Sequence, residues 1–267
     1  MSLITAPIVV SSGDFTVYLD DTGSSISIFD IAGDVLFTEE ADCGERLSYP
    51  QFSGFKLVFC SSSRGLLVRD LLTGELVVLN SGRTGAPWIS SEGDVWYSVD
   101  GFLAVNSAVT DIPVSSFSVS VENSVAVFTD RSDNLHIVSL EDGSDRQISG
   151  YRFYLPFVLQ NGDVVVSTLC GSIVYVPFNE DLVVLAFGTQ PCWSNELSGL
   201  FYCVSEDDGH NLTGADIWFV RLSELPVRVI DSPGVLETKP SCSGDYLWFI
   251  DAISGEPDFL RLNDVSF

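Results

Sequence analysis

Residues 50–60, PQFSGFKLVFC, form one copy of a pattern that recurs seven times along this chain. A proline opens the copy, a short strand follows, Ser53-Gly54 makes a polar turn, and a strongly apolar second strand runs from Lys56 to Cys60. Successive copies begin about 30 to 50 residues apart, close to the period of propeller repeats. The first residues of the seven copies are Pro7, Pro50, Pro87, Phe117, Pro156, Pro191 and Pro240.

Each copy divides into four strands separated by turns rich in Gly, Asp, Asn and Ser. In the copy at Pro50, the third strand is expected over 65–70 and the fourth over 76–79, with Gly74 in the turn between them. The second strands are apolar on both faces, which is typical of sheets stacked face to face. They are expected at 15–19, 56–60, 95–99, 125–128, 164–167, 200–204 and 246–250. We therefore expect an all-β fold, a single seven-bladed β-propeller of four-stranded blades, with residues 1–267 in one domain.

The seventh copy shows only three strands before the chain ends. Leu3-Ile4-Thr5 precede Pro7 in the same way that Val229-Ile230-Asp231 precede the anchor Pro240. The N-terminal segment is therefore predicted to supply the missing outer strand and to close the propeller, which removes exposed sheet edges.

Two stretches carry a likeness to a known family, SGFKLVF at 53–59 and PSCSGDYLWF at 240–249. The order of proline, first strand, S-x-G or N-G turn, apolar strand and a later D-x-x-x-G-[DE] motif resembles the TolB-like and WD-repeat-like (WD40-like) propeller superfamily. The family's S-P-D-G turn appears nowhere intact. The resemblance implies the propeller fold and a frequent role in protein interaction, and it transfers no catalytic residue.

The charge balance restricts the partners. The chain has 37 acidic and 12 basic residues and a net charge of -25, so we expect it to bind neither nucleic acid nor an anionic membrane. Two interpretations stay open, a soluble acidic coat or adaptation to a salty environment. No apolar run approaches the length of a membrane span, and no secretory signal is visible. The expected location is the cytoplasm or a larger assembled particle.

The sequence offers little catalytic chemistry. The expected first strands of the seven copies contain no charged residue and no histidine, so they lack the paired carboxylates of a glycosidase. His136 lies in a predicted strand over 135–138, where a structural role is expected. The acidic runs at 20–21, 130–133 and 206–208 resemble calcium loops, but their place between strands favours hairpin turns. The six cysteines are expected to be buried, reduced thiols. We expect no enzymatic activity, no cofactor and no metal site.

Three long segments between predicted strands could hold a binding surface, because function on rigid β scaffolds often resides in loops. They are 39–49, 205–214 and 232–239, which should cluster on one side of one face. The candidate binding residues are Glu39, Glu40, Asp42, Arg46, Glu206, Asp207, Asp208, His210, Glu237 and Lys239. The expected occupant is a protein with a basic or polar surface.

The leading functional hypothesis is a non-catalytic scaffold for protein interaction, alone or as a subunit of a larger assembly such as a virion or tail. The alternative is a carbohydrate-binding or carbohydrate-active propeller that uses Trp88 and Trp193 as stacking platforms.

Overall fold

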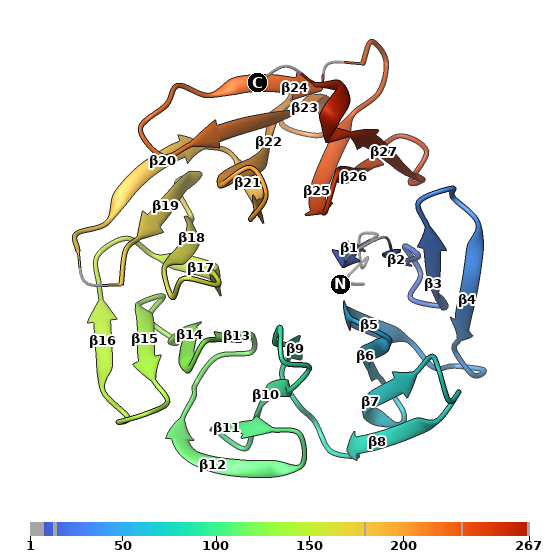
Figure 1. Ribbon diagram of the computed structural model, residues 1–267, viewed down its shortest axis with the longest axis vertical. Helices are drawn as coiled ribbons and strands as arrows, with labels where there is room; N and C mark the ends of the chain where they lie inside the picture. The colour runs from blue at the N-terminus through green and yellow to red at the C-terminus, as the bar shows by residue number, and fades with distance from the viewer. Residues whose placement is uncertain (1–7, 13–14, 179, 231, 266–267) are drawn as a thin grey trace. The chain divides into compact units, whose positions relative to one another are not determined.

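The computed structural model describes residues 8–12, 15–178, 180–230 and 232–265 (Figure 1). These residues form seven successive antiparallel sheets and one short 3-10 turn, η1 (Leu262–Asp264). The fold is thus the all-β seven-bladed β-propeller that the repeat predicts, and the blades are numbered 1 to 7 in chain order.

The strands follow one another in the sheets in chain order, by antiparallel pairing of neighbours. Blades 1 and 2 contain β1 (Ile8–Ser12), β2 (Phe15–Leu19), β3 (Ser25–Asp30), β4 (Val35–Glu40), β5 (Leu47–Ser53), β6 (Lys56–Ser61), β7 (Gly65–Asp70) and β8 (Leu76–Asn80). Blades 3 and 4 contain β9 (Trp88–Ile89), β10 (Val95–Val99), β11 (Phe102–Val105), β12 (Ala108–Pro113), β13 (Val119–Glu122), β14 (Val125–Thr129), β15 (Leu135–Ser139) and β16 (Asp145–Ile148). Blades 5 to 7 contain β17 (Phe153–Val158), β18 (Val164–Thr168), β19 (Ser172–Val176), β20 (Val183–Phe187), β21 (Thr189–Ser194), β22 (Gly199–Asp207), β23 (Leu212–Arg221), β24 (Val227–Ile230), β25 (Glu237–Ser243), β26 (Tyr246–Asp251) and β27 (Pro257–Arg261).

The strands divide into two compact units. One unit holds blades 1, 6 and 7, the other holds blades 2, 3 and 4, and the strands of blade 5 are shared between them. The organisation of 1–267 as a single domain stays a prediction.

The second strands are buried on both faces, as their composition predicts. In blades 4 and 5, Val127 and Val166 are fully buried in one cluster that joins β14, β15, β17, β18 and β19. In the other unit, Phe201 of blade 6 and Leu247 of blade 7 share a cluster, while Trp248 packs on the opposite face of β26 against Tyr18 of blade 1. Each buried side chain of this kind contributes about 1.5 to 3 kcal/mol, so the contacts between neighbouring blades hold each unit together.

The anchor prolines mark a bulge in the first strand of four blades. The residue before the proline has a positive φ, 53° at Tyr49, 48° at Leu155, 55° at Gln190 and 53° at Lys239, and the pairing register shifts at the same place. A β-bulge leaves the extra residue outside the hydrogen-bond ladder, and proline, which has no N–H, is tolerated at such a site. The bulge is the physical reason for the recurring proline.

The first strands of several blades differ from their predicted bounds at one or both ends. β5 begins at Leu47, β13 ends at Glu122, and β25 begins at Glu237. The prediction that these strands carry no charged residue is therefore wrong, since Glu122, Glu237 and Lys239 lie within them. Phe117, assigned as the anchor of blade 4, lies before β13 and is 49% exposed.

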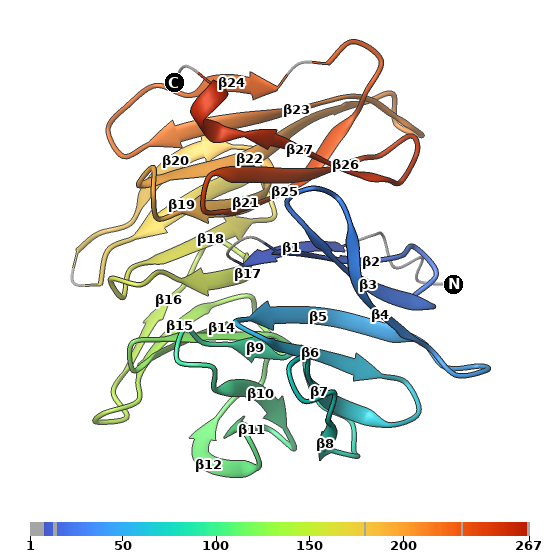
Figure 2. The ribbon, with the colours of Figure 1, turned by 45° about the vertical axis from the view of Figure 1, so that its right-hand side comes forward.

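Blade 7 contains three strands in the described part of the chain. Leu3-Ile4-Thr5 lie outside the described residues, so closure by the N-terminal segment stays a prediction. β1 lies beside β25 (Figure 1, Figure 2), and the hydroxyl of Tyr18 in blade 1 donates to the carbonyl oxygen of Gly255 in blade 7 over 2.9 Å.

Candidate functional site

Blade 6 carries a hairpin that is longer than its counterparts. β22 has 9 residues and β23 has 10, whereas β6 and β7 of blade 2 have 6 each and β14 and β15 of blade 4 have 5 each. Ser205 pairs with Ala215 and Glu206 with Gly214, so most of the loop predicted at 205–214 is strand. The tight turn itself is confined to the residues between Asp207 and Leu212.

Carboxylates shape the tip of this hairpin. Asp208 accepts the backbone N–H groups of Asn211 at 2.7 Å and His210 at 2.9 Å, and these bonds hold the pKa of its carboxyl below the ordinary value. Asp207 accepts the N–H of Gly209 at 2.8 Å. Glu206, Asp207, Asp208 and His210 are all exposed. The tip therefore presents three neighbouring acidic residues to solvent.

Glu237 and Glu39 do not lie on the surface. Glu237 is 0% exposed, and its Oε1 accepts the N–H of Ser232 at 2.9 Å while its Oε2 has no hydrogen-bond partner among the described residues. Glu237 lies three residues before Pro240, just as the buried Leu47 lies three residues before Pro50 in blade 2. Glu39 is 6% exposed. The segment predicted as loop over 232–239 ends where β25 begins, which explains the burial of Glu237.

Lys239 and Glu40 remain accessible. Lys239 occupies the bulge of β25, and its backbone N–H donates to Oε1 of Gln190 in the neighbouring blade at 2.8 Å. Burial of part of the side chain lowers the pKa of Lys239 to about 8. Glu40 is exposed at the end of β4.

Asp42 and Arg46 belong to the unit that contains blade 2. Both side chains are exposed, and their backbone N–H groups donate to Glu45 and to Ser62 respectively. The ten candidate residues thus fall into two units, eight in one and two in the other. Their clustering into one binding surface stays a prediction.

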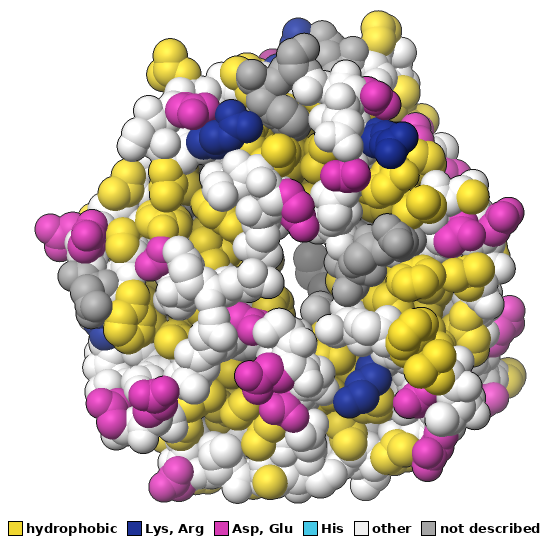
Figure 3. All heavy atoms as spheres, in the orientation of Figure 1, with side chains coloured by type: hydrophobic (Ala, Val, Ile, Leu, Met, Phe, Trp, Pro, Cys, Tyr) yellow, Lys and Arg dark blue, Asp and Glu magenta, His cyan; other side chains and the backbone are white. Residues whose placement is uncertain are grey.

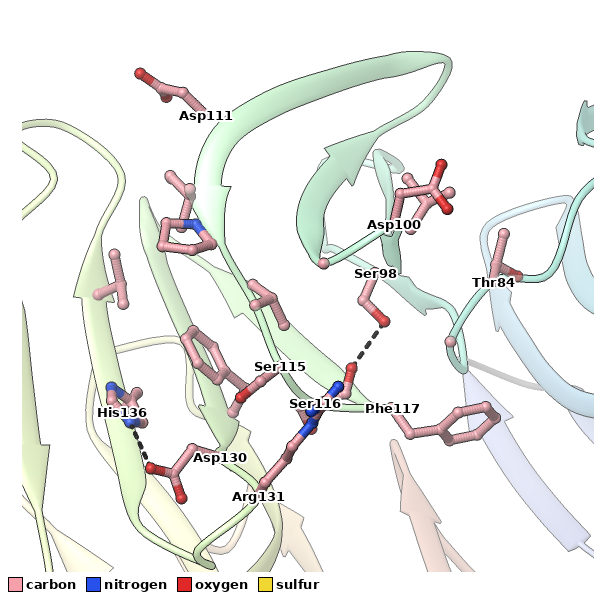
Figure 4. Close-up of a pocket in the computed structure, with 18 of the residues that line it drawn as sticks. Thr84, Ser98, Asp100, Asp111, Ser115, Ser116, Phe117, Asp130, Arg131 and His136 are labelled. Carbon is pink, nitrogen blue, oxygen red and sulfur yellow. Dashed lines mark hydrogen bonds and ion pairs between the residues drawn. The ribbon is translucent and has the colours of Figure 1, made fainter.

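A pocket of about 1040 Å³, which the sequence did not reveal, opens between blades 3 and 4 (Figure 4). Ser98 and Asp100 line it from blade 3, the segment between β12 and β13 crosses it, and Asp130 and His136 line it from blade 4. In this segment the carbonyl oxygen of Ser116 accepts a hydrogen bond from the hydroxyl of Ser98 at 2.8 Å. The pocket combines carboxylates, hydroxyls and an aromatic ring.

His136 is clamped at the edge of this pocket. Its Nδ1 lies 2.8 Å from Oδ2 of Asp145, its Nε2 lies 3.4 Å from Oδ2 of Asp130, and its ring stacks on Phe128 with a 5.1 Å centroid distance. The side-chain amide of Asn134, with further hydrogen bonds, lowers the pKa of Asp130 to about 2. Both imidazole nitrogens are engaged, so the arrangement fixes the ring rather than presenting a free base. The predicted hairpin turn at 130–133 is confirmed.

Two guanidinium groups of the pocket are unengaged in the part of the chain that the structure describes. Arg83 and Arg131 are exposed and form no hydrogen bond or ion pair there. Phe117 contacts Tyr49 with ring centroids 5.1 Å apart. Elsewhere basic side chains are few, and carboxylates are spread over the face shown in Figure 3.

The two proposed tryptophan platforms are partly buried. The indole N–H of Trp88 donates to the carbonyl oxygen of Val121 at 2.9 Å, and its ring packs against the cluster between blades 3 and 4. Trp193 is also only partly exposed. Trp88 thus serves as core, which removes it as a free stacking surface.

The described residues contain no group of three or more His, Cys, Asp or Glu side chains arranged to hold a metal ion. Nor do they contain a helix with the length and apolar character needed to cross a membrane.

Comparisons with known proteins agree with the fold. No protein-family model matches the chain, and no curated protein matches it. The β-propeller domain of Cps50 (Swd1) from Myceliophteria thermophila is similar over 98% of both chains, with 11% identity and a TM-score of 0.69. A chain of a mitotic checkpoint complex is similar over 98% of this chain and 88% of its own, with 11% identity and a TM-score of 0.71. The computationally designed Ika8 protein is 14% identical over 95% of this chain and 82% of its own, with a TM-score of 0.61. These likenesses confirm the propeller fold that the sequence resemblance implied.

Proposed function

We propose that this chain is a non-catalytic β-propeller that binds a protein partner, alone or as part of a larger assembly. The observation that carries the proposal is the extended β22–β23 hairpin, which adds strand residues beyond the length of its counterparts and ends in an exposed acidic tip. A similar propeller chain belongs to a mitotic checkpoint complex, which supports an interaction role at the level of the fold.

The tip favours a basic or polar partner surface. Glu206, Asp207 and Asp208 stand next to one another, and the hydrogen bonds that hold Asp207 and Asp208 fix the direction of their carboxylates. Charge complementarity of this kind increases the association rate and selects against acidic partners. The pairing of β22 with β23 orders the backbone of the hairpin, which limits the conformational entropy lost on binding.

The test compares two triple variants of the whole chain. In the first, Glu206, Asp207 and Asp208 are replaced by serine. In the matched control, serine replaces Glu75, Glu141 and Asp142, which are exposed and lie at or beside turns between third and fourth strands. Both triple replacements change the net charge by the same amount. Proteins captured from the native source by wild type are identified, and the affinity of the purified partner is then measured for each variant.

We expect the first variant to bind about tenfold more weakly, with a smaller dependence on salt concentration, and the control to bind as wild type does. Equal affinity of both variants would exclude the hairpin as the docking surface. Failure of any protein to bind wild type at micromolar concentration would count against the interaction role itself.

A second candidate function is the binding of a polar small molecule, such as a carbohydrate, in the pocket between blades 3 and 4. The favouring observation is the combination of Asp100, Asp111 and the exposed ring of Phe117 in one pocket of about 1040 Å³, because sugar binding uses hydrogen-bonding groups beside an aromatic ring. A glycan array with wild type and Phe117→Ala would detect binding that depends on the ring. The virion or tail role stays a prediction.

A further inference from the structure

The cysteines do not behave as the sequence led us to expect. Only Cys203 is buried, Cys43 and Cys170 are exposed, and the other three are partly exposed. Two of these, Cys192 in β21 and Cys242 in β25, lie in contact with each other across blades 6 and 7. Both strands belong to the same compact unit, where they lie side by side (Figure 1, Figure 2).

The two sulfur atoms are 2.9 Å apart. A disulfide bond brings two sulfur atoms to about 2.05 Å, so a shift of about 0.9 Å separates the thiol pair from a covalent bond. In the described residues no other two cysteine sulfurs are in contact.

Hydrogen bonds give the two thiols different roles. The backbone N–H of Cys242 donates to Sγ of Cys192 at 3.0 Å, a contact that stabilises negative charge on that sulfur. The thiol of Cys242 lies 3.0 Å from the carbonyl oxygen of Trp193 and donates to it. The adjacent sulfur of Cys192, together with partial burial, raises the pKa of the Cys242 thiol well above its ordinary value. The backbone N–H contact therefore assigns Cys192 as the attacking sulfur, and Cys242 is the thiol that reacts second.

We propose that Cys192 and Cys242 form a reversible disulfide bond that joins the first strands of blades 6 and 7 when the protein meets a small-molecule disulfide. The Cys192 thiolate attacks one sulfur of the small molecule, the S–S bond of that molecule breaks, and its other half leaves as a thiol after protonation. Cys242 then loses its proton and attacks Sγ of Cys192 in the mixed disulfide. The second half of the small molecule leaves, so two protein thiols are oxidised and one small disulfide is reduced to two thiols.

The positions of the two cysteines in their repeats explain why the pair forms. Cys192 follows Pro191 directly, and Cys242 is the second residue after Pro240. Both therefore follow the bulge of a first strand, and in adjacent blades such strands face each other. The separation of 50 residues in sequence hides this proximity unless the copies are aligned.

The test uses the full chain with Cys43 and Cys170 replaced by serine, which removes the two exposed thiols. After incubation with oxidised glutathione and blocking of the remaining thiols, cleavage after glutamate places Cys192 in peptide 181–196 and Cys242 in peptide 238–267, because the Glu256-Pro257 bond resists this cleavage. Before blocking, we expect the intact protein to be about 2 Da lighter than the reduced form. After cleavage, we expect the two peptides to be joined and to separate on reduction.

Two further variants test the order of the reaction. In Cys242→Ser, we expect a stable glutathione adduct on Cys192, since the second thiol is absent. In Cys192→Ser, we expect Cys242 to stay unmodified under the same conditions. Free thiols at both positions in the parent protein, or a bond from Cys192 to Cys203 instead, would overturn the proposal. An adduct on Cys242 in Cys192→Ser that forms as fast as the one on Cys192 would overturn the order of attack.

Discussion

Glu45 provides the sharpest test of whether a buried carboxylate stabilises the fold of this acidic protein. It lies within 39–49, which the sequence predicts as a long loop, yet it is 7% exposed. Arg64 holds its carboxylate, with Nε 2.8 Å from Oε1 and Nη2 3.0 Å from Oε2. The hydroxyls of Ser61 and Ser63 and the backbone N–H of Asp42 donate to the same carboxylate. The loop that precedes β5 is thus anchored on one buried carboxylate.

The magnitude follows from the pKa. Burial alone would raise the pKa of Glu45, but the hydrogen bonds from Arg64, Ser61, Asp42 and Ser63 outweigh burial and lower it from 4.5 to about 2. Because the folded state holds the proton less tightly than the unfolded state, the ionised carboxylate stabilises the fold above pH 4.5 and loses this effect as the pH falls towards 2. At 1.36 kcal/mol for each pKa unit the effect is about 3.4 kcal/mol, which we reduce to about 2 to 3 kcal/mol because solvent screens the partly exposed Arg64.

We therefore expect Glu45→Gln to lower the free energy of unfolding by about 2 to 3 kcal/mol at pH 7, and by less than half of that at pH 3. Urea titrations of wild type and variant at pH 7, 5, 4 and 3 measure the difference. Glu75→Gln, at an exposed turn position, is the matched control and should differ little from wild type at each pH. A difference between Glu45→Gln and wild type that does not change with pH would refute the role of the ionised carboxylate.

Three other predictions concern packing and closure. Gly85→Ala would place a Cβ 2.1 Å from the carbonyl oxygen of Phe117, so we expect the free energy of unfolding in urea titrations to fall by about 2 to 4 kcal/mol. In the control Gly82→Ala, the Cβ meets only the flexible Asn80 side chain, and the free energy should fall by less than about 1 kcal/mol. Equal losses in the two variants would contradict the steric account. Tyr18→Phe removes the hydrogen bond from blade 1 to Gly255 of blade 7 and should cost about 1 kcal/mol by the same assay, so an unchanged free energy would show that water replaces it. Deletion of residues 1–6 should lower the melting temperature by several degrees in calorimetry if the N-terminal segment completes blade 7, and an unchanged melting temperature would rule out that closure.

The repeat determined most of the fold because its apolar positions recur wherever two blades pack together. The strand predicted at 15–19 matches β2, and the strand predicted at 95–99 matches β10. The errors lie at strand ends and have local causes. The polar run Ser205-Glu206-Asp207 suggests a loop, yet pairing with β23 continues through it, because backbone hydrogen bonds form whatever the side chains are.

The candidate sites were harder to predict because they depend on contacts between blades. Glu237 looks like a surface residue in sequence, and only its place three residues before Pro240 assigns it to a buried position. The pocket near His136 arises where the segment after β12 crosses to blade 4, which no periodicity encodes. The contact between Cys192 and Cys242 could have been inferred by aligning the copies at their prolines, since both cysteines then fall just after the same bulge.

At the bulge before the anchor proline, a residue that packs in the core stands next to a residue that faces solvent. Pro50, Pro156 and Pro240 are buried, but Tyr49 and Leu155, which precede two of them, are 39% and 61% exposed. Across four blades this one backbone conformation is occupied by an aromatic, an aliphatic, an amide and a cationic side chain, at Tyr49, Leu155, Gln190 and Lys239. The chemistry displayed there can thus change from blade to blade without repacking the core, so the chain can acquire a new recognition surface at these positions while every blade keeps the same scaffold.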